Sequence, residues 1–295
     1  MNDESDMAFF ALVARSGSFA DAALELGVSG SAVSRRLARL EERLGARLMH
    51  RTTRRASLTS EGEAYLAAAQ RILSQIAAVE ESIAGAREQP RGLLRVNATF
   101  QFGREHVGPA LAAFQAEYPE VEAQLVLSDT PRNLVEEGFD IGIRFGLPAS
   151  SQLIARLVLR NRRFLVATPD YLARRGTPQR LSDLSGHNCI IIRQEDTAYD
   201  LWRFAEGGES VRVGGTLSSN DGEIARNWTL AGLGIMMRSE WDVNRHIAEG
   251  RLVKVLPRHF SEAHIYAVYP QPSHLSAKVG RFVEFLSQRL ARSFG

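Results

Sequence analysis

The sequence predicts an α/β protein with an all-α domain at its N-terminus and two α/β subdomains behind it. Apolar residues recur at helical spacing through the first 90 residues, and strand-like and helical segments alternate beyond Gly92. The length of 295 residues suits two domains of roughly 150 residues each. With 44% hydrophobic and 24% charged residues, the chain can bury a core, which argues against a disordered or fibrous protein.

Three short helices and a small β-wing are predicted in the N-terminal domain. The expected helices cover residues 7–15, 19–26 and 30–44. Ser18 and Ser29 are the expected N-caps of the second and third helices, and Gly27 and Gly45 are expected to end them. Residues 47–58 carry charges without a helical period, so we expect them to form the wing.

A long amphipathic helix is predicted from Thr59 or Ser60 toward Arg87. Ser60 and Glu63 have the spacing of a capping box, and apolar residues follow at intervals of three and four. Pro90, within a Gln-Pro-Arg-Gly stretch, is expected to end this helix and to mark a domain boundary.

The remaining 200 or so residues are predicted to form open, mainly parallel sheets, because strands alternate with helices. The expected strands cover residues 93–96, 121–127, 139–145, 164–167, 189–192, 234–237 and 265–268. The expected helices cover residues 106–118, 133–137, 222–230, 240–248 and 276–289. Two such sets of elements predict two α/β subdomains with a cleft between them.

The second and third helices carry the spacing of a helix-turn-helix unit. Such a unit needs a small residue, a turn glycine four residues later and an apolar residue six further, and Ala23, Gly27 and Val33 supply these. Leu26, Val28 and Leu37 are expected to complete the contact between the helices. The motif favours a second helix placed in the major groove of DNA over an ordinary helical hairpin.

Basic residues are concentrated behind this motif. Residues 35–55 hold eight arginines against two acids, a local net charge of +6 in 21 residues of a chain whose net charge is +2. Such a stretch indicates a polyanion partner, although a solvated helix face is the alternative. Arg36 is equally well explained as an ion-pair partner of Glu41 or Glu42. The predicted DNA-binding residues are Ser29, Ser31, Ser34, Arg35, Arg36, Arg39, Arg51, Arg54 and Arg55.

In these segments the sequence resembles the LysR-type transcriptional regulators. The residues that carry the resemblance are Phe19-Ala20-Asp21-Ala22-Ala23, Val28 to Leu37, Leu40-Glu41-Glu42-Arg43-Leu44-Gly45, His50-Arg51-Thr52-Thr53-Arg54 and Leu58-Thr59-Ser60-Glu61-Gly62. By the resemblance, Ser34 and Arg35 contact bases or phosphates, and Arg51 and Arg54 of the wing approach the DNA backbone or minor groove. The chain departs from the family at Gly30 and Ser31, where glutamine and proline are frequent, so base readout at position 30 is lost.

The resemblance implies a winged helix-turn-helix domain over residues 1–58, a dimerising linker helix over 59–89 and an effector-binding domain over 90–295. In that last domain, two periplasmic-binding-protein-like subdomains are expected, one from residues 90–161 and 266–295 and the other from 162–265. The implied partners are promoter or operator DNA, a small-molecule effector, further copies of the chain in a dimer or tetramer, and possible contact with RNA polymerase.

Effector contacts are expected where strands end, because open α/β sheets bind ligands beyond the carboxyl ends of their strands. The candidate residues are Thr99, Phe100, Gln101, Phe102, Arg104, Ser128, Arg144, Phe145, Thr168, Asn220 and Met236. Helix capping is an equal alternative for Thr99 and Ser128, an ion pair is an alternative for Arg144, and Asn220 or Asp221 is the expected N-cap of the following helix. Residues 163–172 and 238–241 resemble the family branch that includes regulators of D-malate and tartrate metabolism, which implies a four-carbon hydroxydicarboxylate effector.

Other functions have weaker support in the sequence. Walker A, GxGxxG, HExxH and GxSxG motifs are absent, so no enzyme, catalytic residue, metal site or cofactor is expected. An architectural DNA-binding protein whose α/β half senses nothing is the main alternative. An acidic N-terminus, a single cysteine (Cys189) and the lack of any run of eighteen apolar residues favour a cytoplasmic protein.

Overall fold

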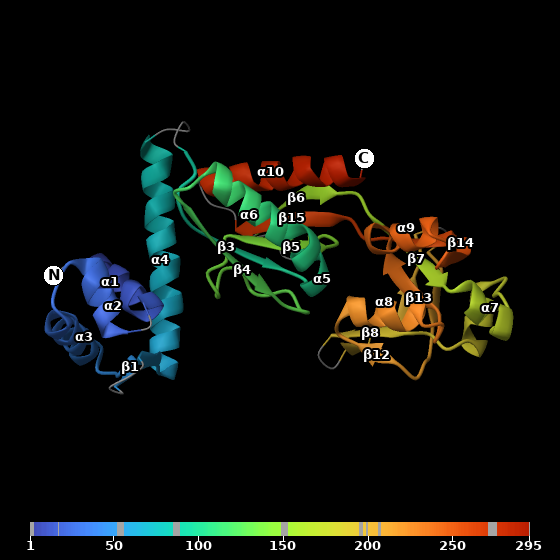
Figure 1. Ribbon diagram of the computed structural model, residues 1–295, viewed down its shortest axis with the longest axis horizontal. Helices are drawn as coiled ribbons and strands as arrows, with labels where there is room; N and C mark the ends of the chain where they lie inside the picture. The colour runs from blue at the N-terminus through green and yellow to red at the C-terminus, as the bar shows by residue number, and fades with distance from the viewer. Residues whose placement is uncertain are drawn as a thin grey trace. The chain divides into compact units, whose positions relative to one another are not determined.

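A computed structural model describes residues 3–16, 18–51, 56–84, 89–148, 153–194, 197–198, 200–205, 208–270 and 276–294. The chain forms two compact units (Figure 1). The first consists of Met1–Gln89 with the short segments Asn133–Phe139 and Pro272–Ala277, and the second contains the rest. Among the helices in the described ranges, none combines the length and the apolar character needed to cross a bilayer.

The first unit contains the predicted helix-turn-helix and wing. Its elements are α1 (Asp3–Ser16), α2 (Phe19–Leu26), α3 (Gly30–Leu44), the antiparallel strands β1 (Met49–Arg51) and β2 (Ala56–Leu58), and α4 (Ser60–Ala84). The side chains of Ser18 and Ser29 accept backbone N–H groups at the starts of α2 and α3, as predicted. Gly27 and Gly45 end these helices with φ of +64° and +66°, the left-handed conformation that glycine adopts without strain.

Two sequence expectations in this unit are wrong. Val28 is 46% exposed and does not belong to the core between α2 and α3, whereas Ala23, Val33 and Leu37 are buried there. The N-cap of α4 is Thr59, whose hydroxyl accepts the N–H of Gly62 at 3.0 Å, so the expected Ser60 capping box does not form. Gly62 is required because a Cβ there would lie 1.9 Å from the carbonyl oxygen of Leu48.

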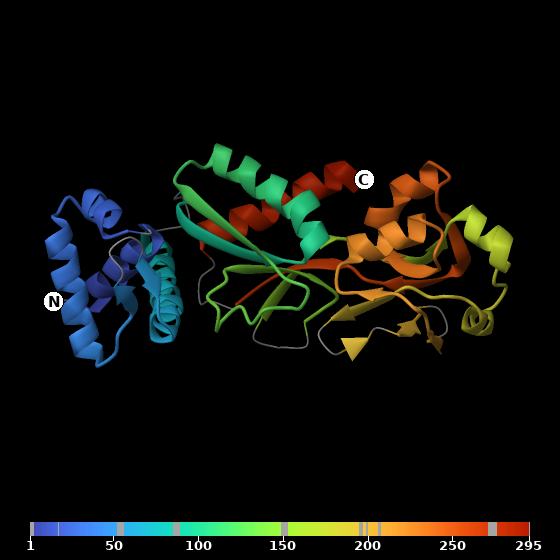
Figure 2. The same ribbon diagram turned by 60° about the horizontal axis from the view of Figure 1, so that its bottom comes forward.

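The second unit contains two lobes (Figure 2), the first built on one sheet and the second on the three sheets β13-β7-β14, β12-β8-β9 and β10-β11. The first lobe is a five-stranded sheet in the order β4-β3-β5-β15-β6. Its elements are β3 (Gly92–Ala98), β4 (Val121–Leu127), β5 (Ile141–Phe145), β6 (Leu153–Leu159), β15 (Ile265–Pro270), α5 (Phe100–Phe102), a π-helical turn (Gly103–Val107), α6 (Gly108–Glu117) and α10 (Ala277–Phe294). Strand β3 runs parallel to β4 and β5, and β15 runs antiparallel to β5 and β6.

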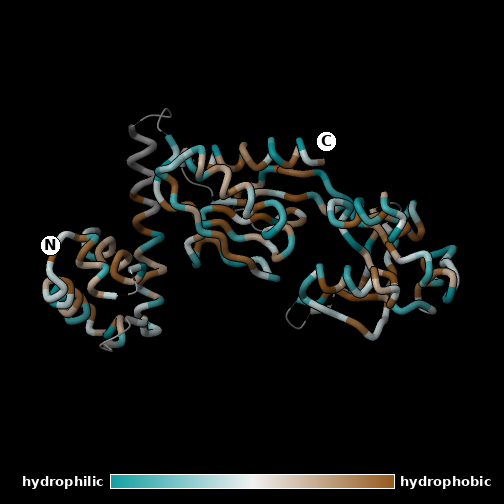
Figure 3. Tube along the Cα trace, viewed as in Figure 1, coloured by the Kyte–Doolittle hydropathy of each residue, from teal (hydrophilic) through white to brown (hydrophobic). Residues whose placement is uncertain are grey.

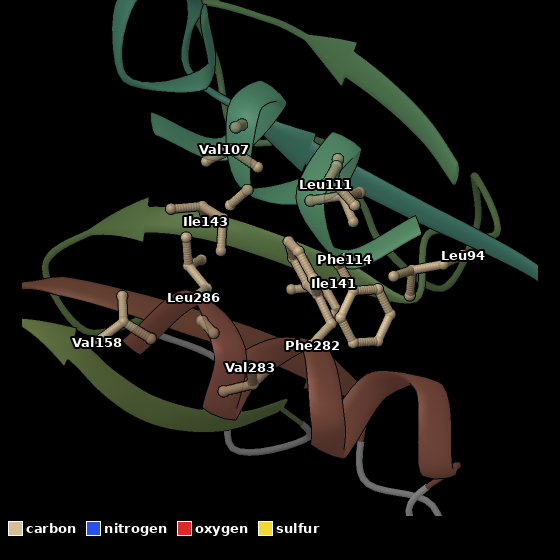
Figure 4. Packing of buried hydrophobic residues seen from close by; sticks show 14 of the residues in the cluster. Leu94, Val107, Leu111, Phe114, Ile141, Ile143, Val158, Phe282, Val283 and Leu286 are labelled. Atoms are coloured by element: carbon tan, nitrogen blue, oxygen red, sulfur yellow. The ribbon is translucent and has the colours of Figure 1, made fainter. Parts of the chain in front are cut away.

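Helices α6 and α10 supply the apolar side chains that cover this sheet (Figure 4). Phe114 of α6 and Phe282 of α10 meet edge to face with their ring centroids 5.3 Å apart, and Leu286 lies in the same cluster as Ile141 and Ile143 of β5. The hydropathy colouring shows apolar residues concentrated in the strands that these helices cover (Figure 3). Burial of these large side chains is the main source of stability of the lobe.

The second lobe is built around β7 (Arg162–Ala167), whose alternate residues enter two different cores. Leu165 and Ala167 belong to one apolar cluster, and Phe164 and Val166 belong to another, as the period of two in a strand dictates. The remaining elements are α7 (Pro169–Arg175), a 3-10 helix (Leu181–Gly186), β8 (Ile191–Gln194), β9 (Thr197–Ala198), β10 (Leu201–Arg203), β11 (Ser210–Arg212), β12 (Ser218–Ser219), α8 (Gly222–Leu230), β13 (Met236–Ser239), α9 (Glu240–Ala248) and β14 (Val253–Glu262).

The expectation of mainly parallel sheets is wrong for this lobe. Both neighbours of β7, namely β13 and β14, run antiparallel to it, and among the described strands of this lobe only β12 and β8 form a parallel pair. Strands β6 and β14 were not expected from the sequence, and the helix expected over residues 133–137 is a single turn. The predicted bounds of α8 and α9 match the structure.

Two short segments join the lobes, one between β6 and β7 and the other between β14 and β15. Asn161, in the first segment, is buried, and its Nδ2 donates to the carbonyl of Ala263 in the second segment at 2.8 Å. The N–H of Ala263 donates back to the carbonyl of Asn161 at 3.0 Å. The two connections are therefore held together where the lobes meet.

Candidate functional site

The recognition helix α3 presents polar and basic side chains to solvent along one face. Ser31, Arg35 and Arg39 are exposed and follow one another at intervals of four residues, which places them on the same side of the helix. Ser34 is half-buried beside them. Ser29 caps the helix by accepting the N–H of Ala32, and its hydroxyl lies 3.0 Å from that of Ser31. This face combines hydroxyl and guanidinium groups, which bind phosphates and base edges.

Arg36 does not belong to that face. Its guanidinium pairs with the buried carboxylate of Asp6 at 3.3 Å, donates to the Ser5 carbonyl at 2.8 Å and lies over the ring of Phe9. The alternative partner expected from the sequence, Glu41 or Glu42, is therefore wrong, and the assignment of Arg36 as a DNA contact stays a prediction for a side chain that Asp6 already holds. Arg36 instead ties α3 to α1.

Glu41 is a structural residue of this domain, a role that the sequence did not predict. Its carboxylate is buried and accepts the N–H groups of Leu48 at 2.9 Å and Met49 at 3.2 Å, so α3 holds the first strand of the wing. The available signal was its position four residues after Leu37, on the apolar stripe of α3. A charged residue on such a stripe indicates a buried partner.

The basic part of the wing lies outside the residues that the structure describes. Arg54 and Arg55 fall in residues 52–55, and the side chain of Arg51 is likewise outside the described part of the chain. Their assignment as DNA contacts remains a prediction.

In the first lobe, three parallel strands bring several of the expected effector residues to one edge. Strands β4, β3 and β5 are neighbours, and their carboxyl ends lead into Ser128, Thr99 and Arg144. The side chain of Asn97 donates to the Ser128 hydroxyl at 3.0 Å, and Arg144 donates to the Asn97 carbonyl at 3.5 Å. We refer to Thr99, Phe100, Ser128 and Arg144 as the effector edge.

The hydrogen bonds of these residues bear on helix capping and ion pairing, the alternatives to effector contact. Thr99 occupies the N-cap position of α5, but its side chain makes no capping hydrogen bond. The hydroxyl of Ser128 donates to the Thr130 carbonyl at 2.7 Å in a loop, so it caps no helix. Arg144 is buried, and its guanidinium also donates to the carbonyls of Ile143 and Arg132 at 3.2 and 3.4 Å.

The aromatic residues near this edge divide between core and edge. Phe100 is half-buried. Phe102 is 1% exposed and packs edge to face against Phe145 and Trp241, with ring centroids 5.8 and 5.2 Å apart. The expectation that Phe102 lines a cleft is therefore wrong, because its ring is enclosed by the core of the first lobe and by Trp241 of the second lobe.

Thr168 and Met236 do not join the effector edge either. Thr168 follows the carboxyl end of β7 and caps α7 by accepting the N–H of Tyr171 at 3.2 Å. Met236 is 0% exposed and lies opposite Val166 in the antiparallel register of β13 with β7. Both lie at the end of β7 opposite Arg162, where the chain enters from the first lobe. The expectation failed because it assumed parallel strands.

Asn220 lies between the lobes, and Asp221 is the N-cap of α8. The Asp221 carboxylate accepts the N–H groups of Glu223 and Ile224, which settles the alternative left open by the sequence. Asn220 donates to the carboxylate of Asp129 in the first lobe at 2.8 Å, and Gln194 donates to the carbonyl of the same residue.

A second set of contacts between the lobes involves Gln101 and Arg104. Arg104 pairs with Glu223, and with Asp221 at 3.5 Å, and the hydrogen bond with Glu223 is the main cause of a raised pKa of its guanidinium. Gln101 is buried against Arg238 and Asp242. Arg226, Arg238 and Asp242 were not expected as site residues, and only the spacing of four between Arg238 and Asp242 hinted at their pairing.

Two titratable groups close to these elements have shifted pKa values. His106 lies among the rings of Phe102, Trp241 and Phe294, and burial lowers its pKa against the opposing charges of Glu105 and Asp242. Burial raises the pKa of the Cys189 thiol to about 12, so the thiolate that reacts with oxidants is scarce. Within the described residues, no three His, Cys, Asp or Glu side chains form a group able to hold a metal ion.

Comparison with known proteins gives a consistent result over the whole chain. Residues 5–63 match the family "Bacterial regulatory helix-turn-helix protein, lysR family", and residues 87–291 match "LysR substrate binding domain". The HTH-type transcriptional regulator DmlR of Escherichia coli is 44% identical over 292 residues, which cover 98% of this chain and 95% of DmlR. The HTH-type transcriptional activator TtdR of the same species is 37% identical over 293 residues, covering 97% and 94%.

Solved structures agree with these relatives. The structure of CrgA, a LysR-type transcriptional regulator from Neisseria meningitidis, is 36% identical, covers 97% of this chain and 98% of CrgA, and has a TM-score of 0.62. The full-length structure of the Vibrio cholerae virulence activator AphB is 26% identical, with coverage of 97% and 98% and a TM-score of 0.59.

Proposed function

The chain belongs to the LysR family of transcriptional regulators, and we propose that it binds operator DNA through α3 and the wing and senses a small anionic metabolite at the effector edge. The observation that carries the DNA part is the exposed face of Ser31, Arg35 and Arg39. A guanidinium on such a face can neutralise a phosphate or grip guanine O6 and N7, and a hydroxyl can bond either partner. Ser34 and the wing arginines 51, 54 and 55 complete the proposed interface.

The proposed effector is a four-carbon hydroxydicarboxylate such as malate or tartrate. Thr99 supplies a hydroxyl with no capping bond, Ser128 a second hydroxyl, and Arg144 a cation that suits a carboxylate. The resemblance of residues 163–172 to regulators of D-malate and tartrate metabolism points to the same class of compound. Binding controls DNA recognition only to the extent that the effector prefers one arrangement of the lobes.

The remaining parts of the proposal concern assembly and place of action. LysR regulators form oligomers, and the linker over residues 59–89, which includes α4, is proposed as the dimer contact, with a tetramer as the larger assembly. Residues 1–58 are the proposed DNA-binding domain, and 90–295 the effector-binding domain. The regulator would act at promoters in the cytoplasm, where contact with RNA polymerase is open to it.

Thermal melting of the full chain against the isomers of malate and tartrate tests the sensing proposal. A ligand at 100 times its dissociation constant adds about 2.7 kcal/mol to the free energy of unfolding, which raises the melting temperature by several degrees. We expect one isomer to act and the response to disappear in Thr99→Val, which removes the hydroxyl and keeps the shape. No shift with any isomer would favour the alternative of an architectural DNA-binding protein.

A further inference from the structure

A buried ion cluster in the second lobe receives a side chain from the first lobe. Asp242 on α9 has a side chain that is 0% exposed, and its carboxylate pairs with Arg226 of α8 and Arg238 of β13. The two arginines are 13% and 14% exposed. Arg226 also pairs with Glu223 at 3.5 Å and with Glu105 of the first lobe at 3.9 Å, whereas Arg238 pairs with no other carboxylate among the described residues. Arg238 is therefore short of acceptors, and an incompletely paired buried charge is costly.

Gln101 of the first lobe completes this cluster. Its Oε1 accepts from Arg238, and its Nε2 donates to Asp242 at 2.5 Å and to Glu105 at 2.9 Å. The amide orientation is fixed by charge, because the reverse orientation would place an oxygen against two carboxylates and N–H groups against a guanidinium. Gln101 is 4% exposed, so water has little access to these bonds.

Apolar and exposed contacts flank Gln101 on the same segment. Phe102 and His106 pack edge to face against Trp241, the residue before Asp242, with ring centroids 5.2 and 5.3 Å apart. Arg104 pairs with Glu223 at the surface. This segment contains the π-helical turn Gly103–Val107, a rare conformation that often marks functional sites.

We propose that Gln101 is a positioning residue, which fastens the segment bearing the effector edge to the Asp242 cluster and so sets how readily the two lobes separate. Gln101 follows Thr99 by two residues, so the segment that would meet the effector moves with it. The effect of Gln101 on regulation rests on the proposed effector site, but its hydrogen bonds with the Asp242 cluster need no ligand. When the lobes separate, Arg238 loses an acceptor and Asp242 loses a donor, and the effector must compensate for this through its preference for one arrangement.

Hydrogen exchange of the full-length chain, without DNA or metabolite, tests the proposal. In Gln101→Met, which keeps the length of the side chain and removes its polar atoms, we expect amides of residues 100–107 and 240–248 to exchange about tenfold faster or more, as loss of hydrogen bonds to charged groups implies. Asp242 keeps both arginines, so the melting temperature should fall by a few degrees at most. Gln115→Met is the matched control, because Gln115 is exposed on α6.

Two results would overturn the proposal: exchange in Gln101→Met equal to that in Gln115→Met, or an increase spread evenly over the whole chain. A second variant sharpens the test. Gln101→Glu places a carboxylate against Asp242 and should accelerate exchange in the same two segments more than Gln101→Met, whereas an unchanged rate would contradict the proposed contact. A positive exchange result combined with a flat metabolite panel would refute the effector assignment alone.

Discussion

The recognition helix and the segment from Thr99 to His106 use similar side chains in opposite ways. On α3, Arg35 and Arg39 are exposed and make no hydrogen bond or ion pair with any residue in the described part of the chain. On the other segment, Arg104 is paired with Glu223 and Asp221, and Gln101 is saturated by three charged partners. Charge without an internal partner is available to an external one, whereas paired charge holds the protein together.

This difference also exists within α3 itself. Arg35 and Arg36 are adjacent in the sequence, yet the first faces solvent and the second is bound to Asp6. Similarly, Glu42 is exposed while Glu41 is buried against the wing. Adjacent positions of the same residue type therefore offer matched pairs of variants.

The largest effect is expected from Glu41→Ala. It leaves the N–H groups of Leu48 and Met49 without their acceptor, and each unsatisfied buried group costs about 1–3 kcal/mol, so the free energy of unfolding of the DNA-binding domain should fall by about 3 kcal/mol. Chemical unfolding followed by circular dichroism measures this loss. Glu42→Ala is the control and should stay within about 0.5 kcal/mol of the wild type. Equal losses in the two variants would show that burial of Glu41 does not support the wing.

Arg35→Ala is expected to weaken DNA binding by about tenfold or more, because a guanidinium that contacts a base edge contributes about 1–3 kcal/mol. If Arg35 contacts a phosphate instead, the slope of log affinity against log salt should fall by about 0.9. Fluorescence anisotropy with a duplex selected from a random library measures both quantities.

Arg36→Ala is the matched variant for that experiment. It should leave the salt slope unchanged and instead lower stability by about 1–3 kcal/mol, because the buried Asp6 carboxylate loses one of its two arginine partners and keeps Arg43. A reduced salt slope in Arg36→Ala, with stability unchanged, would reverse the roles that the structure gives to these two residues.

The matched pairs also indicate what a sequence can predict. Helix ends were predicted well at Ser18, Ser29, Gly27 and Gly45, because capping depends on residues within one turn. The pairing of Arg36 with Asp6 was not predicted, because the two residues lie 30 positions apart and each has the sequence pattern of a solvated surface charge. The contact between Gln101 and Asp242 spans 141 positions and has no local signal.

Strand direction explains why some of the expected effector residues lie together at one edge and others do not. The rule that parallel strands bring their carboxyl ends to one edge holds in the first lobe, where it gathers Thr99, Ser128 and Arg144. It fails in the second lobe, because β13 runs antiparallel to β7. Met236 therefore begins its strand beside the end of β7 that leads to Thr168, away from the connection. Strand direction follows from the path of the chain and the long strand β14, neither of which has a local sequence signature.

Acidification should destabilise the segment from Thr99 to His106 before it affects the recognition helix α3. Burial lowers the pKa of His106 below its ordinary value, so the folded state resists a proton that the unfolded state accepts. The contribution of His106 to the free energy of unfolding is therefore fully present at neutral pH. It is lost as the pH falls below about 6.5 toward the folded-state pKa of His106. His187 and His246, whose pKa values are also lowered chiefly by burial, add to the same trend.

Melting temperatures between pH 7.5 and 5.5 measure this contribution in His106→Phe, which preserves the ring contacts with Phe102 and Trp241. The fall in melting temperature over this range should be smaller in the variant than in the wild type. His50→Gln, at an exposed position of the wing, should retain the wild-type dependence. A variant that follows the wild-type curve would exclude His106 as a source of the acid sensitivity.

The smallest effect is expected from Arg104→Ala, although the sequence favoured Arg104 as an effector contact. Its pair with Glu223 joins side chains that are 44% and 36% exposed, and exposed ion pairs contribute about 0–1 kcal/mol because water and salt screen them. We expect the melting temperature and any response to malate or tartrate isomers to match those of Arg175→Ala, which alters an exposed arginine at the end of α7. If Arg104→Ala alone abolished the metabolite response, we would infer that the Arg104 guanidinium of the wild type leaves Glu223 to bind the effector. Partnered charge on the segment from Thr99 to His106 would then be as available to a ligand as the exposed charge of α3, and the distinction between the two regions would not hold.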